Sequence, residues 1–136
     1  MTERWRELEA RYGESGIHRV LGLSLAVNGL GDVEVSYDGR PEAGNRAGNT
    51  AGGALSQMID SCVMQAAATH VEPGDGLTTL ELKVNFVKPA PPGGKLTARG
   101  LIKHIGRTTA VGTGEIADEQ GNIVAIGLVT VALRRR

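Results

Sequence analysis

Residues 49–67 read NTAGGALSQMIDSCVMQAA, and apolar side chains recur along this stretch with the period of a helix. The i, i+3, i+4, i+7, i+8 pattern is followed by Leu55, Met58, Ile59, Cys62, Val63, Ala66 and Ala67. This spacing places apolar side chains on one face of an α-helix. We expect Asn49 or Thr50 to cap the helix, because either side chain can accept a hydrogen bond from a free helical N–H. The stretch therefore predicts one long helix with a buried face.

Upstream of this helix, the sequence predicts a short amphipathic helix and two strands. The first helix covers about residues 2–13, with Thr2 as its N-cap and Gly13 as its stop. Residues 21–27 and 32–37 are strand-like, and the Asn28–Gly31 segment between them has the composition of a hairpin turn.

Downstream of the helix, the hydrophobic pattern changes to the alternation that is typical of strands. Four strands are expected, at residues 78–87, 95–105, 108–118 and 123–133. An antiparallel sheet that follows a single apolar helix is expected to curl around that helix. The sequence thus predicts an α+β fold in one domain covering residues 1–136.

The composition excludes several classes of partner. Basic and acidic residues number 15 each, and the formal net charge is zero, whereas nucleic-acid binding needs a basic excess on one face. We therefore expect no nucleic-acid partner.

A single cysteine, Cys62, excludes an intrachain disulfide and indicates a reducing compartment. We find neither a signal-peptide pattern nor an apolar run that could cross a bilayer, so we expect a cytoplasmic protein with no membrane partner.

The histidines and the cysteine do not suggest a reactive centre. The three histidines, His18, His70 and His104, lack the spacing of metal ligands, and we expect no metal site. Cys62 lies on the apolar face of the predicted helix without a nearby histidine in sequence, so we expect a buried, inert thiol.

Asp60 is the most informative single residue. It lies near the middle of an otherwise apolar helix, on one flank with Ser56 and Met64. A carboxylate in such a place is costly unless it is solvated, paired or used in a reaction. From the pattern alone, two interpretations stand side by side: a partly exposed Asp at a subunit boundary, and a catalytic carboxylate.

The approach to the helix is a second candidate for chemistry. Residues 48–53, Gly48-Asn49-Thr50-Ala51-Gly52-Gly53, lead directly into the helix. Free N–H groups at a helix start lie at the positive end of the helix dipole and can stabilise an oxygen on which negative charge develops. The alternative is a tight loop that needs glycine for its backbone alone.

These residues together resemble the signature of a known family. The pattern Asn45-x-x-Gly48-x-x-Ala51-Gly52-Gly53, followed by Asp60, resembles the Asn-x-x-Gly-x-x-His-Gly-Gly…Asp signature of PaaI-like hotdog-fold acyl-CoA thioesterases. The stretch Thr79–Pro89 is similar to the strand that follows the helix in that family, and Gly106-Arg107-Thr108 with Ala125-x-Gly127 is similar to its last hairpin region. The resemblance covers about residues 15–133.

The resemblance implies a site and an assembly. Asp60 would be the nucleophile or the general base, the Gly52 N–H would polarise the thioester carbonyl, and Asn45 would orient the carbonyl or the water. The substrate would be an acyl-CoA, with coenzyme A as part of it and no separate cofactor. The site would lie between subunits of a homo-oligomer, either a dimer or a dimer of dimers formed by edge-to-edge sheet pairing.

The resemblance also implies the residues that contact the substrate. Those expected near the acyl thioester are Ala51, Gly53, Met64 and Asn85, and those expected near the coenzyme A moiety are Lys88, Gly106, Arg107 and Thr108. Lys103 is a further cation that could meet the phosphates. The alternative for these charges is that they are solvated residues at strand ends.

One position departs from the family signature, and it opens an alternative function. Ala51 stands where the family usually has His, and its side chain can neither donate nor accept a hydrogen bond. Hydrolysis of an acyl-CoA thioester is the leading hypothesis, and an acyl-CoA binding protein with little or no turnover is the alternative. A hotdog dehydratase or hydratase is disfavoured because no histidine lies in the loop or at the helix start, and a purely structural module would leave Asp60 unexplained.

Overall fold

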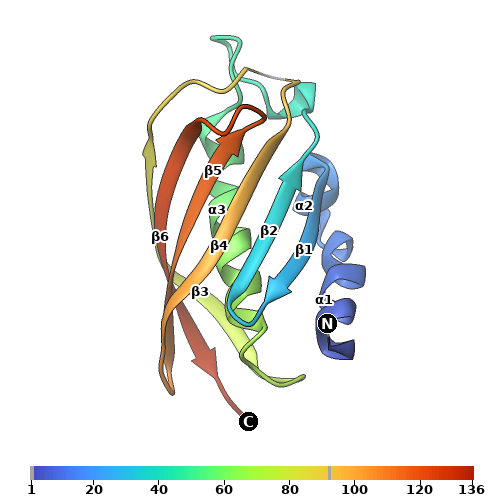
Figure 1. Ribbon diagram of the computed structural model, residues 1–136, viewed down its shortest axis with the longest axis vertical. Coiled ribbons are helices and arrows are strands. Elements are labelled where there is room, and N and C mark those ends of the chain that lie inside the picture. The colour runs from blue at the N-terminus through green and yellow to red at the C-terminus, as the bar shows by residue number, and fades with distance from the viewer. Residues whose placement is uncertain (1, 92) are drawn as a thin grey trace.

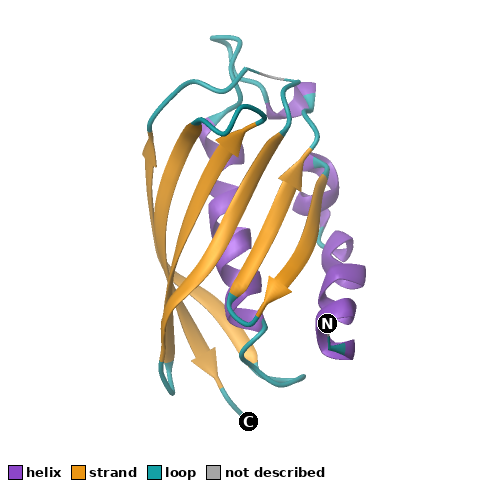
Figure 2. Cartoon of the chain, in the orientation of Figure 1, coloured by secondary structure: helices purple, strands orange, loops and turns teal. Residues whose placement is uncertain are grey.

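The computed structural model describes residues 2–91 and 93–136 and shows an antiparallel sheet curled around one long helix (Figures 1 and 2). The sheet has six strands in the order β1-β2-β4-β5-β6-β3. Its strands are β1 (Leu23–Gly29), β2 (Asp32–Tyr37), β3 (Gly76–Phe86), β4 (Leu96–Ile105), β5 (Thr109–Asp118) and β6 (Ile123–Arg134). The helices are α1 (Glu3–Arg11), α2 (Gly16–Leu21) and α3 (Gly52–Ala68), with short 3-10 turns at Tyr12–Glu14 and Pro41–Ala43. The predicted α+β architecture is confirmed.

Helix α3 is the centre of the core, as its apolar spacing predicts. Met58, Ile59, Cys62 and Val63 are fully buried, and the sheet packs against them. Two glycines of the sheet permit this close approach. A Cβ on Gly100 would overlap the Cys62 carbonyl, and one on Gly127 would lie 2.5 Å from Ile59 Cγ2.

The predicted cap of α3 is wrong. The N-cap is Ala51, which makes no side-chain capping bond. Thr50 instead donates its backbone N–H to the Ala90 carbonyl and its hydroxyl to the Pro91 carbonyl, at 2.6 and 3.4 Å. Pairing with this distant segment sets where the helix begins, and no local capping preference could indicate that pairing.

The segment before β1 also differs from the prediction. Leu21 and Gly22 were expected to begin a strand, but Leu21 is the last residue of α2 and Gly22 is its C-cap, with a φ of 64°. The left-handed conformation of Gly22 ends the helix, and β1 follows directly at Leu23. No helical pattern marks α2 in the sequence, because its six residues are too few for a clear helical period.

The two edges of the sheet are covered differently. Helix α1 lies along β1 (Figure 1), and the Glu9 carboxylate accepts a hydrogen bond from the Val27 N–H at 3.1 Å. Thr2 caps this helix as predicted, since its hydroxyl oxygen accepts from the Trp5 N–H. Strand β3 forms the other edge, and among the described residues no strand pairs with its outer side.

Exposed apolar side chains gather around the β3 edge. Leu80 and Phe86 of β3 are 61% and 56% exposed, and Val87 directly after the strand is also exposed. No helix in the described part of the chain combines the length and the apolar character that crossing a membrane requires.

Candidate active site

A cavity of about 330 Å³ opens at the N-terminal end of α3. Its wall combines the loop before the helix, the first turn of the helix, and the chain that leaves β3. The lining residues are Asn45, Asn49, Thr50, Gly52, Leu55, Phe86, Val87, Lys88, Pro89 and Ala90. The cavity therefore contains two of the three predicted catalytic residues, Asn45 and Gly52, and the predicted coenzyme A contact Lys88.

Asn45 organises the loop that forms one wall. Its side-chain oxygen accepts hydrogen bonds from the N–H groups of Ala47 and Asn49, at 3.0 and 3.1 Å, and its own N–H donates to the Asn49 carbonyl at 2.8 Å. The Ala51 N–H donates to the Ala43 carbonyl and anchors the end of the loop. Because the Asn45 oxygen is used within the loop, only its NH₂ group remains as a donor toward the cavity.

The start of α3 carries free backbone donors, and one of their residues, Gly52, lines the same cavity. Ala54 and Leu55 donate their N–H groups to the Ala51 carbonyl, whereas the N–H groups of Gly52 and Gly53 have no acceptor within residues 2–91 and 93–136. Free N–H groups at a helix start attract a carbonyl oxygen that gains negative charge. The Phe86 ring lies against Gly52, since a Cβ there would come 3.1 Å from Phe86 Cζ.

Asp60 lies farther along the helix, half-buried, with a partner that the sequence analysis did not identify. The Thr79 hydroxyl of β3 donates a hydrogen bond to Asp60 Oδ1 at 2.6 Å. Within the described chain, no Lys, Arg or His lies within ion-pair distance of this carboxylate. Asp60 is thus oriented by Thr79 and is not neutralised by a cation.

Within one chain, Asp60 lies away from the cavity. Asp60 is eight residues beyond Gly52, which at the α-helical rise corresponds to about 12 Å along the axis, and it does not line the cavity. Met64, one turn further, is half-buried and packs against the core. Each chain therefore carries two separate groups, Asn45 with Gly52 at the helix start and Asp60 with Thr79 in its middle.

The remaining predicted contacts are spread over the chain. Ala51 is the N-cap and Gly53 is exposed in the first turn of α3, while Asn85 pairs in register with exposed Ile126 and its side-chain oxygen accepts from Lys83 Nζ. Asn85 does not line the cavity.

The predicted coenzyme A contacts lie at opposite ends of the sheet within one chain. Lys88 lines the cavity, and its ammonium nitrogen is 4.0 Å from Asp118 Oδ2. The turn with Gly106, Arg107 and Thr108 joins β4 to β5 at the other end of these strands (Figure 1). Within one chain, Lys88 and this turn are therefore separated by the length of β5.

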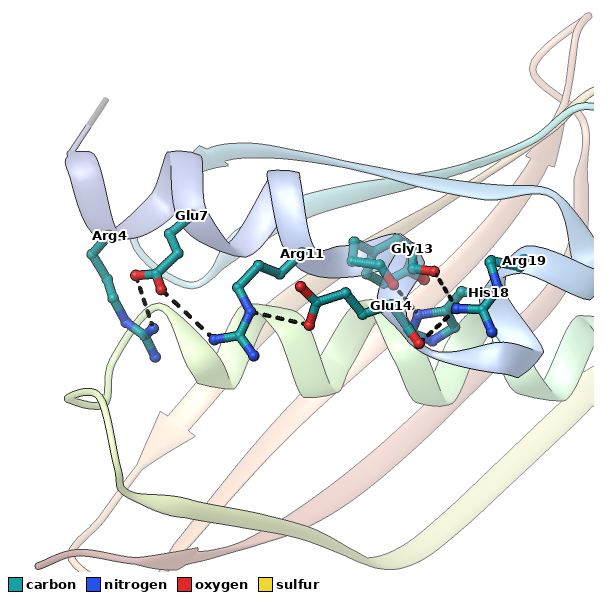
Figure 3. A network of polar contacts seen from close by, with 8 residues as sticks. Arg4, Glu7, Arg11, Gly13, Glu14, His18 and Arg19 are labelled. Carbon is teal, nitrogen blue, oxygen red and sulfur yellow. Dashed lines mark hydrogen bonds and ion pairs between the residues drawn. The ribbon is translucent and has the colours of Figure 1, made fainter.

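Other polar groups are structural. Buried Tyr12, His18 and Ser61 share hydrogen bonds that fasten the N-terminal segment to α3. A chain of ion pairs joins Arg4, Glu7, Arg11 and Glu14 along the same segment (Figure 3). Burial raises the pKa of Cys62 to about 12, so its thiol is unreactive at neutral pH. Within the described residues, no three His, Cys, Asp or Glu side chains form a possible metal site.

Known proteins resemble this chain in sequence. The family model described as "Thioesterase superfamily" matches residues 47–125, a range that includes Gly52, Asp60 and Thr79. The 1,4-dihydroxy-2-naphthoyl-CoA hydrolase of Listeria monocytogenes is 23% identical over 121 residues, which are 89% of this chain and 98% of that protein.

Solved structures share the whole fold. The PaaI protein of E. coli, from the phenylacetic acid degradation operon, superposes with a TM-score of 0.85 at 22% identity, covering 98% of this chain and 93% of that one. A thioesterase of Haemophilus influenzae superposes with a TM-score of 0.88 at 19% identity, covering 99% and 93% of the two chains. These similarities confirm the predicted hotdog fold.

Proposed function

This chain belongs to the thioesterase superfamily, and from that premise we propose that it hydrolyses an acyl-CoA thioester to a free acid and coenzyme A. The observation that carries the proposal is the state of Asp60: a carboxylate in a buried helix, hydrogen-bonded to Thr79 and without a cation partner in the described chain. The Listeria relative, whose name is that of an acyl-CoA hydrolase, supports the same substrate class.

In the proposed reaction, Asp60 acts on the thioester carbon directly or through water. As a general base, its carboxylate takes a proton while the water oxygen bonds to the carbonyl carbon; the C–S bond then breaks, and the proton passes to the coenzyme A sulfur. As a nucleophile, the carboxylate would bond to the carbonyl carbon and expel coenzyme A as its thiolate. Water would then hydrolyse the resulting anhydride, which releases the acid, restores the Asp60 carboxylate and supplies the proton to the sulfur. The Thr79 hydroxyl holds one carboxylate oxygen, which leaves the other free for this step.

The helix start supplies the groups that polarise the carbonyl. The free Gly52 N–H donates to the thioester oxygen, and the helix dipole favours the negative charge that develops there. The Asn45 NH₂ group orients the carbonyl or the water from the adjacent loop wall. Coenzyme A enters as part of the substrate, and the reaction needs no other cofactor.

The proposal includes a second copy of the chain, because Gly52 and Asp60 are too far apart along one helix to act on one carbonyl group. The uncovered β3 edge and its exposed Leu80 and Phe86 favour edge-to-edge pairing of two copies into a dimer, or a dimer of dimers. In such an assembly, Gly52 and Asn45 of one copy act with Asp60 and Thr79 of the other. The single buried cysteine favours the cytoplasm as the location.

The test is thiol release from short-chain, medium-chain and aromatic acyl-CoAs by the native chain and by Asp60→Asn. We expect turnover of at least one member of the panel. The variant should lose activity about 10²- to 10⁴-fold, because Asn cannot accept the proton, while its unfolding temperature stays close to that of the native chain. Equal rates for the two proteins would refute the role of Asp60.

Ala51 favours one alternative, an acyl-CoA binding protein with little or no turnover. As the N-cap, Ala51 offers no side-chain donor or acceptor to hold the substrate. A binder would show calorimetric affinity for the same acyl-CoAs without thiol release, and Asp60→Asn would change that affinity little.

A further inference from the structure

Asn49 lines the cavity, and its side-chain amide has no hydrogen-bond partner in the described part of the chain. The residue is half-buried. Its polar neighbours are engaged: the Asn45 oxygen holds the loop, and the Thr50 hydroxyl donates to the Pro91 carbonyl. Asn49 thus offers both a carbonyl oxygen and an NH₂ group to a ligand in the cavity.

The loop itself does not need this side chain. Only the backbone of Asn49 takes part in the turn, through its N–H to the Asn45 side-chain oxygen and its carbonyl to the Asn45 N–H. An amide that is partly removed from water without a partner is unfavourable, and an apolar side chain would suit the wall beside Leu55 and Phe86 better. The amide therefore has no structural explanation within the chain.

The chemistry of the cavity indicates which part of the substrate would meet this amide. The helix start carries free N–H groups that can bind a carbonyl oxygen, and Lys88 lines another part of the wall. The other lining residues are mostly apolar. A carboxamide donates and accepts at once, which matches a secondary amide. The pantetheine arm of coenzyme A carries two secondary amides between its phosphates and its thiol.

We propose that Asn49 binds a secondary amide of the pantetheine arm and thereby holds the thioester beside Gly52. The inference rests on the proposed function, because it takes an acyl-CoA as the ligand. Since the contact forms away from the reacting carbonyl, it is the same in the bound substrate and in the transition state. It therefore strengthens binding and leaves the chemical step unchanged.

The test measures the affinity of a thioether analogue of acyl-CoA, which cannot be hydrolysed, for the native chain, Asn49→Ala and Asn49→Leu. Asn28→Ala, an exposed position on β1 away from the cavity, is the matched control. We expect both Asn49 variants to bind about three- to tenfold more weakly, with KM raised by a similar factor on a hydrolysed acyl-CoA and kcat unchanged. The unfolding temperature should stay the same, because the loop keeps its backbone hydrogen bonds. If Asn49→Ala disturbs the fold, the affinity is measured on Asn49→Leu, whose side chain has nearly the same shape as that of Asn.

Failure of the Asn49 contact and failure of the proposed hydrolysis give different results. A change in affinity of less than about threefold in both variants, or a fall in kcat with KM unchanged, overturns the role of Asn49. Analogue binding without turnover of any acyl-CoA overturns hydrolysis alone, and the affinities of the variants still decide the role of Asn49. A native chain that does not bind the analogue overturns both.

Discussion

At the scale of single residues, two substitutions at Gly52 test the proposed N–H donor with little other change to the helix start. Ala51 has φ −63° and ψ 142°, a conformation that a residue before proline readily adopts, and proline is well tolerated in the first turn of a helix. Gly52→Pro therefore fits the backbone but has no N–H, whereas Gly52→Ala keeps the N–H. Both substitutions add a Cβ against the Phe86 ring, so the two variants share this contact.

We predict that Gly52→Pro lowers kcat on an acyl-CoA about 10²- to 10³-fold relative to Gly52→Ala, as for the loss of one oxyanion-hole donor. Steady-state thiol release on the two variants checks the ratio, with thermal unfolding to confirm that both are folded. If the two variants lose activity equally, crowding against Phe86 explains the loss and the N–H plays no part.

At the scale of elements, the chain closes one edge of its sheet and leaves the other open. Helix α1 has no fully buried residue, yet the Glu9 carboxylate reaches β1 and accepts from the Val27 N–H. An edge strand with free backbone groups can pair with another chain, and a covering helix is one way to prevent this. The cover on β1 leaves β3 as the edge that is available for pairing.

We predict that Glu9→Ala speeds hydrogen–deuterium exchange of the Val27 amide about 10- to 150-fold, the equivalent of a hydrogen bond to a charged group. Glu7→Ala is the matched control on the same helix, because the exposed Glu7 carboxylate pairs only with Arg4 and Arg11, at 3.9 and 3.7 Å, and should contribute little. Equal exchange of Val27 in the two variants would show that Glu9 does not hold the edge.

At the scale of the whole molecule, each proposed site needs two chains. Asp60→Asn removes the carboxylate and Gly52→Pro removes the N–H, so neither variant alone has an intact site. If the two groups act across subunits, a mixed dimer has one intact site, made from the unchanged Gly52 of one copy and the unchanged Asp60 of the other.

We predict that refolding the two inactive variants together at equal amounts restores about a quarter of the native activity, because half of the dimers are mixed and each has one intact site. Thiol release before and after co-refolding, with each variant refolded alone as the control, measures this. No recovery, with mixed dimers detected by mass spectrometry, would place Gly52 and Asp60 in one chain's own site.

Local pattern was enough to predict the long helix, the six strands and their order along the chain, because burial repeats with a short period within each element. It also indicated Asp60 and the glycines at the helix start, since a carboxylate and paired glycines in an apolar helix break that pattern. Helix α2 and the cap of α3 were missed, because a six-residue helix has little period and Thr50 is bound to a segment some 40 residues away.

Contacts between elements could not be predicted from the sequence and are seen only in the tertiary structure. Thr79 lies 19 residues from Asp60, and no local signal links them; the antiparallel register of β3 with β6 sets where Thr79 meets the helix. The sheet order likewise places the chain after β3 beside the loop before α3, which forms the cavity, and leaves the β4–β5 turn at the far end from Lys88. Periodic burial is a property of each segment alone, whereas strand order and register depend on how all segments pack together around α3. The geometry of the site is therefore defined only in the folded chain.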